Sequence, residues 1–235
     1  MLMYLAAVSL LLGLNSGSIS AQNPAAPQED KWEFSGFFGV SQLGDHAYPT
    51  PIEGGDSKTV NLSYDPGYAL GFRITENLGR KFGAELEYSY VDNSLSFSNL
   101  SDLVPNLNVK QRLHKIVYSI LVYPIGRKGR VQPFGSFGGG TSYFQIADDS
   151  EAAQNEIILK DRWKLAASFG GGVKIPLSGP WGFRVDFRDQ ITSVPSFGLP
   201  EIVPSFQGNS GAGLLPDGLF HDWQIDAGFI YRFRP

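Results

Sequence analysis

Few residues in this 235-residue chain have the types and spacing that catalysis or metal binding requires. The three histidines are His46, His114 and His221, and no HExxH or other metal-ligand spacing joins them. A GxSxG nucleophile motif is absent, and neither glycine triplet (138–140, 170–172) is followed by the GKS or GKT ending of a phosphate-binding loop. The lack of cysteine excludes disulfides and thiolate metal sites. The sequence therefore predicts no catalytic residue, no metal site and no cofactor.

Charged side chains are more informative, because many of them recur at alternate positions beside apolar residues. Seven cations and five carboxylates share one face by this alternation, Lys164 and Lys174 among them. If that face is buried, the charges must pair, since an unpaired buried charge is costly. We expect Arg73 to face Glu85 across a turn near residue 79, and Glu33 to meet Arg232; loosely hydrated charges without fixed partners are the alternative. The ion-pair candidates are Glu33, Arg73, Glu85, Glu87, Lys115, Arg184, Asp186, Arg188, Asp226 and Arg232.

The alternation has a period of two, which indicates β-strands and not helices. It predicts strands at 32–40, 68–75, 82–91, 163–175, 181–191 and 223–233, and two less regular strands at about 111–123 and 131–144. The short links are 76–81, 124–130 and 176–180, and the long links are about 42–66, 92–110, 145–162 and 192–222. This regular change between short and long links predicts an all-β fold, an eight-stranded antiparallel up-and-down barrel with four long outer loops and three short periplasmic turns.

Aromatic residues indicate that the apolar face of this barrel points outward into lipid. They lie near strand ends on the apolar face, as the aromatic girdles of a transmembrane barrel require. Strands of about ten residues match a tilted membrane-spanning strand, and closure leaves no strand edge unpaired in lipid. The predicted girdle residues are Trp32, Trp163, Trp181, Trp223, Tyr90, Tyr143 and Tyr231.

The N-terminal residues indicate export. Residues 1–21 are typical of a secretory signal peptide, with an apolar run followed by small residues. Residues 22–30 are expected to form a flexible periplasmic leader, and residues 31–235 the transmembrane barrel domain.

The net charge of −4 disfavours nucleic acid as a partner, because phosphate binding calls for an excess of cations.

The last predicted strand carries a more specific pattern. Residues 226–233 read DAGFIYRF, and Asp226, Gly228, Tyr231 and Phe233 resemble the C-terminal assembly signal of bacterial outer-membrane proteins, although Arg234 and Pro235 follow the final aromatic. With the eight strands, residues 31–233 resemble the small outer-membrane β-barrels of the OmpA/OmpX type. The resemblance implies a monomer in the outer membrane of a Gram-negative bacterium, in contact with outer-membrane lipid and lipopolysaccharide and inserted by the barrel assembly machinery.

An eight-stranded barrel has an interior only wide enough for side chains. We therefore expect a non-catalytic protein without a large pore, which contributes to envelope integrity or to surface interaction through its loops. The first alternative is an OmpW-like channel for small solutes or hydrophobic compounds; it needs an apolar upper lumen, for which the inward Phe37, Phe134 and Phe144 are few. A lipid A-modifying barrel enzyme is a less favoured alternative. The acidic loop 145–162 is expected to be a solvated surface, with divalent-cation or partner binding as the other reading.

Overall fold

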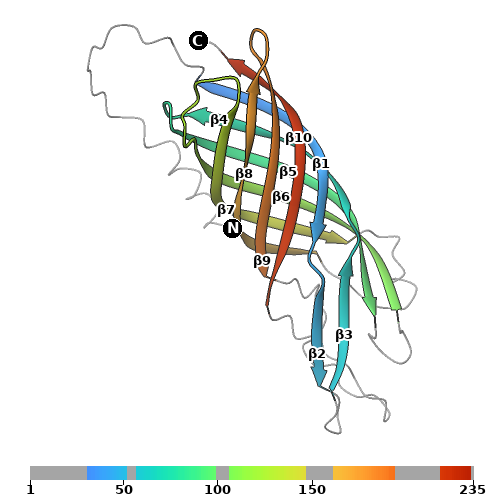
Figure 1. Cartoon of the computed structure of the whole chain (residues 1–235). Coiled ribbons are helices and arrows are strands. Elements are labelled where there is room, and N and C mark those ends of the chain that lie inside the picture. The colour runs from blue at the N-terminus through green and yellow to red at the C-terminus, as the bar shows by residue number, and fades with distance from the viewer. Residues whose placement is uncertain (1–30, 52–56, 99–105, 147–160, 194–217, 234–235) are drawn as a thin grey trace, which may run out of the picture.

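The segments in which apolar and polar residues alternate form β-strands in the computed structural model of the chain, ten strands in all (Figure 1). The structure describes residues 31–51, 57–98, 106–146, 161–193 and 218–233. Within these ranges no helix is long and apolar enough to cross a membrane, a finding that does not bear on β-barrels. The strands are β1 (Trp32–Leu43), β2 (His46–Pro51), β3 (Ser57–Tyr64), β4 (Gly67–Asn77), β5 (Phe82–Ser98), β6 (Asn106–Val122), β7 (Gln132–Ile146), β8 (Arg162–Pro176), β9 (Trp181–Ser193) and β10 (Leu219–Phe233).

Eight of these strands close into an antiparallel barrel, as the sequence predicts. The order around the barrel is β1, β4, β5, β6, β7, β8, β9 and β10, and β10 pairs with β1 to close it. Short turns join β4 to β5, β6 to β7 and β8 to β9 at one end, which we call the turn end. The opposite end is the loop end. Closure leaves no free edge strand around the barrel, which a lipid environment demands.

The strands at the loop end are longer than predicted. The expected loop at 42–66 contains β2 and β3, which form a hairpin that projects past the loop end in Figure 1. The expected loop at 92–110 is largely occupied by extensions of β5 and β6, which stay paired as far as Ser98 and Asn106. Outward positions there hold residues such as Ser94, Ser96 and Lys110. The apolar alternation ends where such polar residues begin, but the hydrogen-bonded ladder continues because it needs no apolar outer face.

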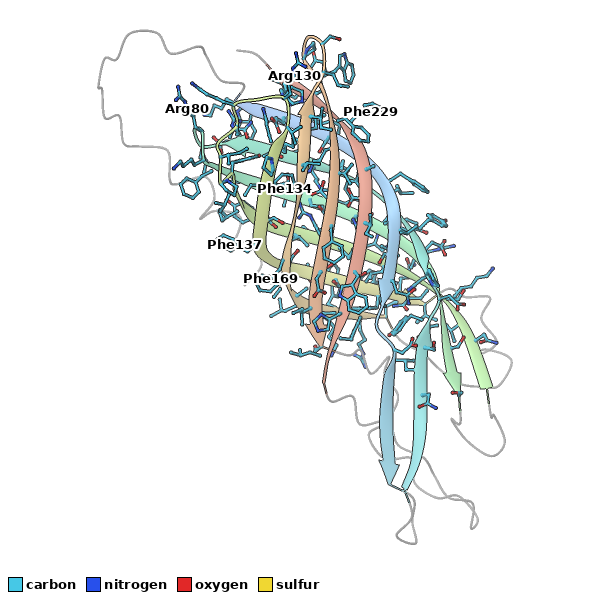
Figure 2. All side chains as sticks on the ribbon, viewed as in Figure 1. Arg80, Arg130, Phe134, Phe137, Phe169 and Phe229 are labelled. Atoms are coloured by element: carbon cyan, nitrogen blue, oxygen red, sulfur yellow. The ribbon has the colours of Figure 1, made fainter. Side chains whose placement is uncertain are left out.

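The two faces of the barrel are opposite in chemistry to those of a soluble protein. Large apolar side chains are exposed around the outside, including Phe38 at 63% and Leu165 at 84% of their surface. In Figure 2, Phe137, Phe169 and Phe229 lie on this outer surface, whereas Phe134 is buried. Polar and charged side chains fill the interior. An outer face of this kind requires an apolar solvent, which is the membrane.

Small residues on β7 and β8 let neighbouring strands approach closely. A Cβ atom on Gly140 would lie 2.0 Å from the carbonyl oxygen of Ile116, and one on Gly170 would lie 2.3 Å from that of Phe187. Both are far inside van der Waals contact, so these positions require glycine. The inward side of the two strands is thereby kept shallow, and the long side chains of β9 have room in the barrel.

Candidate functional site

The barrel interior is the most distinctive feature of the described residues. Twelve charged side chains are buried in it, six cations and six carboxylates, so their formal charges cancel. They form three tiers along the barrel, from the turn end through the middle to the loop end. The six cations are Arg73, Lys115, Lys174, Arg184, Arg188 and Arg232, and the six carboxylates are Glu33, Glu85, Glu87, Asp186, Asp222 and Asp226.

Arg73 on β4 joins three strands in the middle tier. Its Nη1 and Nη2 atoms donate to the two carboxylate oxygens of Asp226 at 2.9 and 2.7 Å, a bidentate arrangement. Its Nε donates to Glu87 on β5. The guanidinium carbon also lies 3.8 Å from the ring centroid of Phe37, so the ring covers the face of the cation.

Glu85 is the anionic centre of the same tier. Its carboxylate accepts from Nη2 of Arg184 at 3.0 Å and from Nη2 of Arg188, and the hydroxyl of Thr75 donates to it at 2.7 Å. Arg184 in turn donates to Asp186 through Nε and Nη2, at 2.6 and 2.7 Å. Hydrogen bonds therefore connect β4, β5, β9 and β10 across the barrel.

A smaller tier lies at the turn end. Lys174 on β8 donates from Nζ to Glu33 on β1, and Arg232 on β10 lies with its Nε 3.4 Å from Oε1 of the same glutamate. Glu33 and Arg232 are also directly opposite in the β1–β10 ladder. One carboxylate thus holds two cations from different strands next to the closing pair of the barrel.

The third tier lies toward the loop end. Lys115 on β6 reaches across the barrel to β10, where its Nζ is 2.8 Å from Oδ2 of Asp222 and 2.7 Å from Oε1 of Gln224. Ser41 also donates to Asp222. Gln224 then donates to Asp226 at 2.8 Å, which links this tier to the middle one. The three tiers fill the barrel with paired charges.

All ten candidates from the sequence are buried in this network, but the pattern misplaced one pair and missed two members. Arg73 is opposite Glu87 in the ladder and not opposite Glu85, which lies 3.9 Å from its Nε. The hairpin turns about one residue later than expected. The alternation puts Lys174 on the inner face but indicates no partner for it, and Asp222 falls in a predicted loop because the regular alternation begins at Trp223.

Above the third tier the interior is apolar, more so than the three inward phenylalanines suggested. The ring of Phe220 lies 5.9 Å from those of Tyr64 and Phe144, so three strands contribute to one aromatic cluster. We call the buried residues around it the loop-end apolar layer. Its members are Leu43, Leu62, Tyr64, Val91, Leu95, Val109, Leu113, Phe144 and Phe220. Sequence reasoning missed most of them because they lie on strand extensions that it took for loops.

The barrel wall is interrupted beside this layer. β1 pairs with β4 as far as Ser41 and Gly67, and β2 pairs with β3 from His46 and Leu62 in the same register. The four positions in between, 42–45 and 63–66, have no ladder pairs. We call this interruption the wall gap.

A β-bulge explains the wall gap. The pairing of β5 shifts by one residue between β3 and β4, so an extra residue lies in the segment that contains Asp65 and Pro66. A bulge bends its strand away from the neighbour, and proline has no N–H to donate to β1. Side chains bridge the opening instead. Gln42 donates to the carbonyl of Tyr64 at 2.9 Å, and Asp45 accepts from the N–H of Tyr64 at 3.1 Å and from the hydroxyl of Ser63 at 2.9 Å.

Two depressions border the 42–45 edge of the wall gap. One has a volume of about 400 Å³ and is lined by the inward Leu43 and Phe220 as well as the outward His221 and Trp223. The other, of about 530 Å³, lies on the outer face and includes Pro66. Gln42 lines both. Open space therefore lies beside the 42–45 edge of the gap, toward β10 where it reaches the inward Leu43 and Phe220, and on the lipid-facing surface next to Pro66.

The predicted girdle residues lie at two levels on the outer face. Near the turn end, the ring of Trp181 lies 5.1 Å from that of Tyr231, and Trp32 is opposite Phe233. Near the loop end, Tyr90 and Tyr143 contact the ring of His114 from either side, at 5.3 and 6.2 Å, and Tyr143 packs on Trp163 at 4.6 Å. Trp223 lies at the loop end of β10. Two aromatic rows separated by an apolar band match the two interfaces of a bilayer.

The histidines and the C-terminal pattern occupy ordinary places on the strands. His114 lies 2.8 Å from the hydroxyl of Tyr88, and His221 lies 2.7 Å from Asp189, both on the outer side. No group of three potential metal ligands is found among the described residues. Asp226 and Gly228 face inward, whereas Tyr231 and Phe233 face outward at the turn end. Their role as an assembly signal stays a prediction.

Comparison with known proteins agrees with this architecture. Residues 9–233 match the family model described as the outer membrane protein beta-barrel domain. The chain belongs to this family. It is accordingly an outer-membrane β-barrel protein of Gram-negative bacteria, and lipid surrounds it. No curated protein sequence matches the chain.

Solved structures show the same fold at low sequence identity. OprG from Pseudomonas aeruginosa has a TM-score of 0.60 and 20% identity, over 88% of this chain and 97% of that one. AlkL, determined in lipid bilayers, has a TM-score of 0.51 and 15% identity, over 93% of this chain and 97% of its own. The outer-membrane protease OmpT from Escherichia coli matches with a TM-score of only 0.43 and 9% identity, over 91% and 100% of the two chains, too low a likeness to bear on the fold. At such identities the likeness establishes the fold alone.

Other predictions fall outside the described residues. The predicted signal peptide and leader, residues 1–30, are among them, and so are the acidic residues Asp148, Asp149, Glu151 and Glu156. These assignments, like the monomeric state and a surface partner for the loops, stay predictions.

Proposed function

We propose that this barrel admits small apolar molecules at its loop end and releases them sideways through the wall gap into the membrane, while its charged interior stays closed. The observation that carries the proposal is the position of the wall gap. It opens next to the loop-end apolar layer, and the paired charges lie below it toward the turn end. A molecule that entered from the loop end would meet apolar side chains first and the tier of Lys115 and Asp222 next.

The energetics favour a sideways exit. An apolar molecule gains roughly 25 cal/mol for each Å² removed from water, and the apolar layer and the membrane both offer that gain. The charged tiers do not, because their hydrogen bonds would have to break without replacement. Among the described residues, three hydrogen bonds that involve the side chains of Gln42 and Asp45 hold the gap edges together. Separating these edges breaks fewer backbone hydrogen bonds than opening any intact ladder.

A disulfide across the gap tests the exit directly. The chain has no cysteine, so an introduced pair has no competitor. Gln42→Cys with Pro66→Cys places a pair across the gap. Val40→Cys with Tyr68→Cys is the matched control, because those residues are opposite each other in the intact part of the same ladder. The measurement is the rate at which N-phenyl-1-naphthylamine, an apolar fluorescent probe, enters cells that carry each variant in the outer membrane.

We expect the wild-type protein to speed probe entry, the oxidised gap variant to lose that effect, and a reductant to restore it. The control pair should leave entry unchanged in both redox states. Equal entry through the oxidised gap variant and the wild-type protein would refute the lateral path.

The second candidate is a non-transporting barrel that supports envelope integrity or meets a surface partner through its loops. The charge balance of the interior favours it, because a network with equal numbers of buried cations and carboxylates closes the lumen whatever the loops do. Both candidates are non-catalytic and both predict that planar-bilayer recordings show no stable, porin-sized conductance. They differ in the probe assay. A strain that lacks the protein and gains detergent sensitivity, with unchanged probe entry, would favour the second candidate.

A further inference from the structure

Two buried amide side chains in the loop-end interior have no hydrogen-bond partner among the described residues. Asn93 on β5 and Gln111 on β6 are directly opposite in the ladder, and both point inward. They are 4% and 0% exposed, and all four of their polar side-chain atoms are unpaired. Each unpaired buried polar group costs on the order of 1–3 kcal/mol, so such a cluster calls for a physical reason.

Apolar residues surround the pair. Val91 and Leu95 flank Asn93 on β5, and Val109 and Leu113 flank Gln111 on β6; all four are buried. Lys115, the next inward residue after Leu113, is already engaged by Asp222 and Gln224. The amides are therefore a polar spot within the apolar layer, separate from the charged tiers.

The pair faces β10, the strand that pairs with β1 beside the wall gap. Lys115 on β6 contacts Asp222 on β10 across the barrel, which shows that these strands face one another. Gln111 and Phe220 lie on the same two strands, both nearer the loop end. Phe220 and Leu43 line the 400 Å³ depression, a volume within the range of small-molecule pockets. An amide anchor on one wall thus faces apolar space on the other.

We propose that Asn93 and Gln111 form the polar anchor of a binding site for small neutral molecules with an apolar body and one hydroxyl or carbonyl group. The inference rests on the proposed role of the apolar layer and names its ligand class. The two amides offer both donors and acceptors, so they pair with an alcohol or a ketone, whereas a plain hydrocarbon leaves them unpaired. An alcohol is therefore bound more tightly than the hydrocarbon of equal length.

The test uses the complete mature barrel in lipid nanodiscs and the side-chain amide signals in nuclear magnetic resonance spectra. The signals are assigned by their loss in Asn93→Leu and Gln111→Leu. The probes are 1-decanol, decane and decanoate. We expect decanol to shift both amide signals, decane to leave them in place, and each Leu variant to bind decanol about tenfold more weakly or worse.

Two further variants guard against a general disturbance of the barrel. Asn108 lies on β6, as Gln111 does, but its amide is exposed and accepts a hydrogen bond from Ser96. Asn108→Leu should therefore not alter decanol binding. Gln111→Asn keeps the amide and should retain the decanol shift. Heat-dependent gel mobility verifies that each variant is folded.

Any of three results would overturn the polar anchor: amide signals that do not shift when decanol is added, equal affinity for decanol and decane, or tighter binding of decanoate than of decanol. The last result would assign binding to the half-buried cations Arg162 and Lys164 on β8 instead. Failure here is distinct from failure of the lateral path. If decanol binds at the amides but the gap disulfide does not slow probe entry, the polar anchor is supported and the lateral path is refuted. If the disulfide slows probe entry but decanol does not bind at the amides, the lateral path is supported and the polar anchor is refuted.

Discussion

At the scale of residues, the interior depends on charges that have several partners. Glu85 is fully buried and within 4 Å of three arginines, Arg73, Arg184 and Arg188. A carboxylate with three cationic neighbours offsets the repulsion among them as well as its own loss of water. Removing it leaves an excess of buried positive charge, which is far more costly than the loss of one exposed ion pair.

We therefore predict that Glu85→Gln lowers the free energy of unfolding by about 3–5 kcal/mol. Glu76→Gln is the control, because Glu76 pairs with Lys31 on the exposed side at 3.3 Å and should cost less than about 1 kcal/mol. Urea titration of the refolded barrel in detergent, followed by tryptophan fluorescence, measures both. Equal losses in the two variants would show that the interior charges are individually hydrated and not mutually dependent.

At the scale of elements, strand contacts decide where the barrel is tight and where it opens. β6 and β7 meet at Gly138 and Gly140, where any side chain would strike the backbone of the neighbouring strand. β1 and the β3–β4 junction separate over four positions because of the bulge at Pro66. The same ladder geometry thus produces a close strand pair on one side of the barrel and the wall gap on the other.

Glycine substitutions on β7 should reveal the close approach. Gly140→Ala should destabilise the barrel by about 1–3 kcal/mol, as overpacking does in protein cores, because its Cβ would lie 2.0 Å from the oxygen of Ile116. Gly135→Ala is the matched control on the same strand, since the nearest atom would be 3.9 Å away. The yield of heat-modifiable folded protein and its urea midpoint provide the comparison. A Gly140→Ala variant as stable as Gly135→Ala would mean that the two strands can move apart without cost.

At the scale of the whole molecule, two chemical gradients define how the barrel lies in the membrane. The outer face changes from aromatic to apolar to aromatic along the barrel axis. The inner face carries paired charges at the turn end and middle, beside a small apolar cluster of Leu121, Tyr123 and Phe134, and is apolar at the loop end. The first gradient fixes the depth of the barrel in the membrane, and the second decides which molecules can enter it.

The depth is testable with the four tryptophans. Variants that keep only Trp32, Trp163, Trp181 or Trp223, with phenylalanine at the other three positions, can be refolded into vesicles of brominated phospholipid. Each should be quenched more strongly by bromine near the glycerol backbone than by bromine near the chain terminus, because aromatic girdles lie at the interfaces. Stronger quenching from the chain terminus for any of them would move that residue out of its girdle and shift the barrel in the membrane.

The amino-acid sequence by itself determined the eight strands of the barrel, which faces of them are apolar, and the membrane setting. Alternation at period two is a local property: side chains on one strand must point to opposite sides, so parity alone placed all ten ion-pair candidates inside and all seven girdle residues outside. It could not place them against one another. Whether Arg73 meets Glu85 or Glu87 depends on a one-residue difference in the turn between two strands, and the partner of Lys174 lies on a strand more than a hundred residues away.

Only the tertiary structure decided the wall gap, the apolar layer and the unpaired amides. Pro66 and Asp65 look like ordinary loop residues in the sequence, and their effect appears only when β3 and β4 must both pair with β5. Asn93 lies in a segment without apolar alternation, so it too resembles a loop, and Gln111 is only the first residue of a less regular predicted strand. The period-two pattern reports how each strand meets the lipid, whereas the contents of the lumen depend on which strands face each other once the barrel closes.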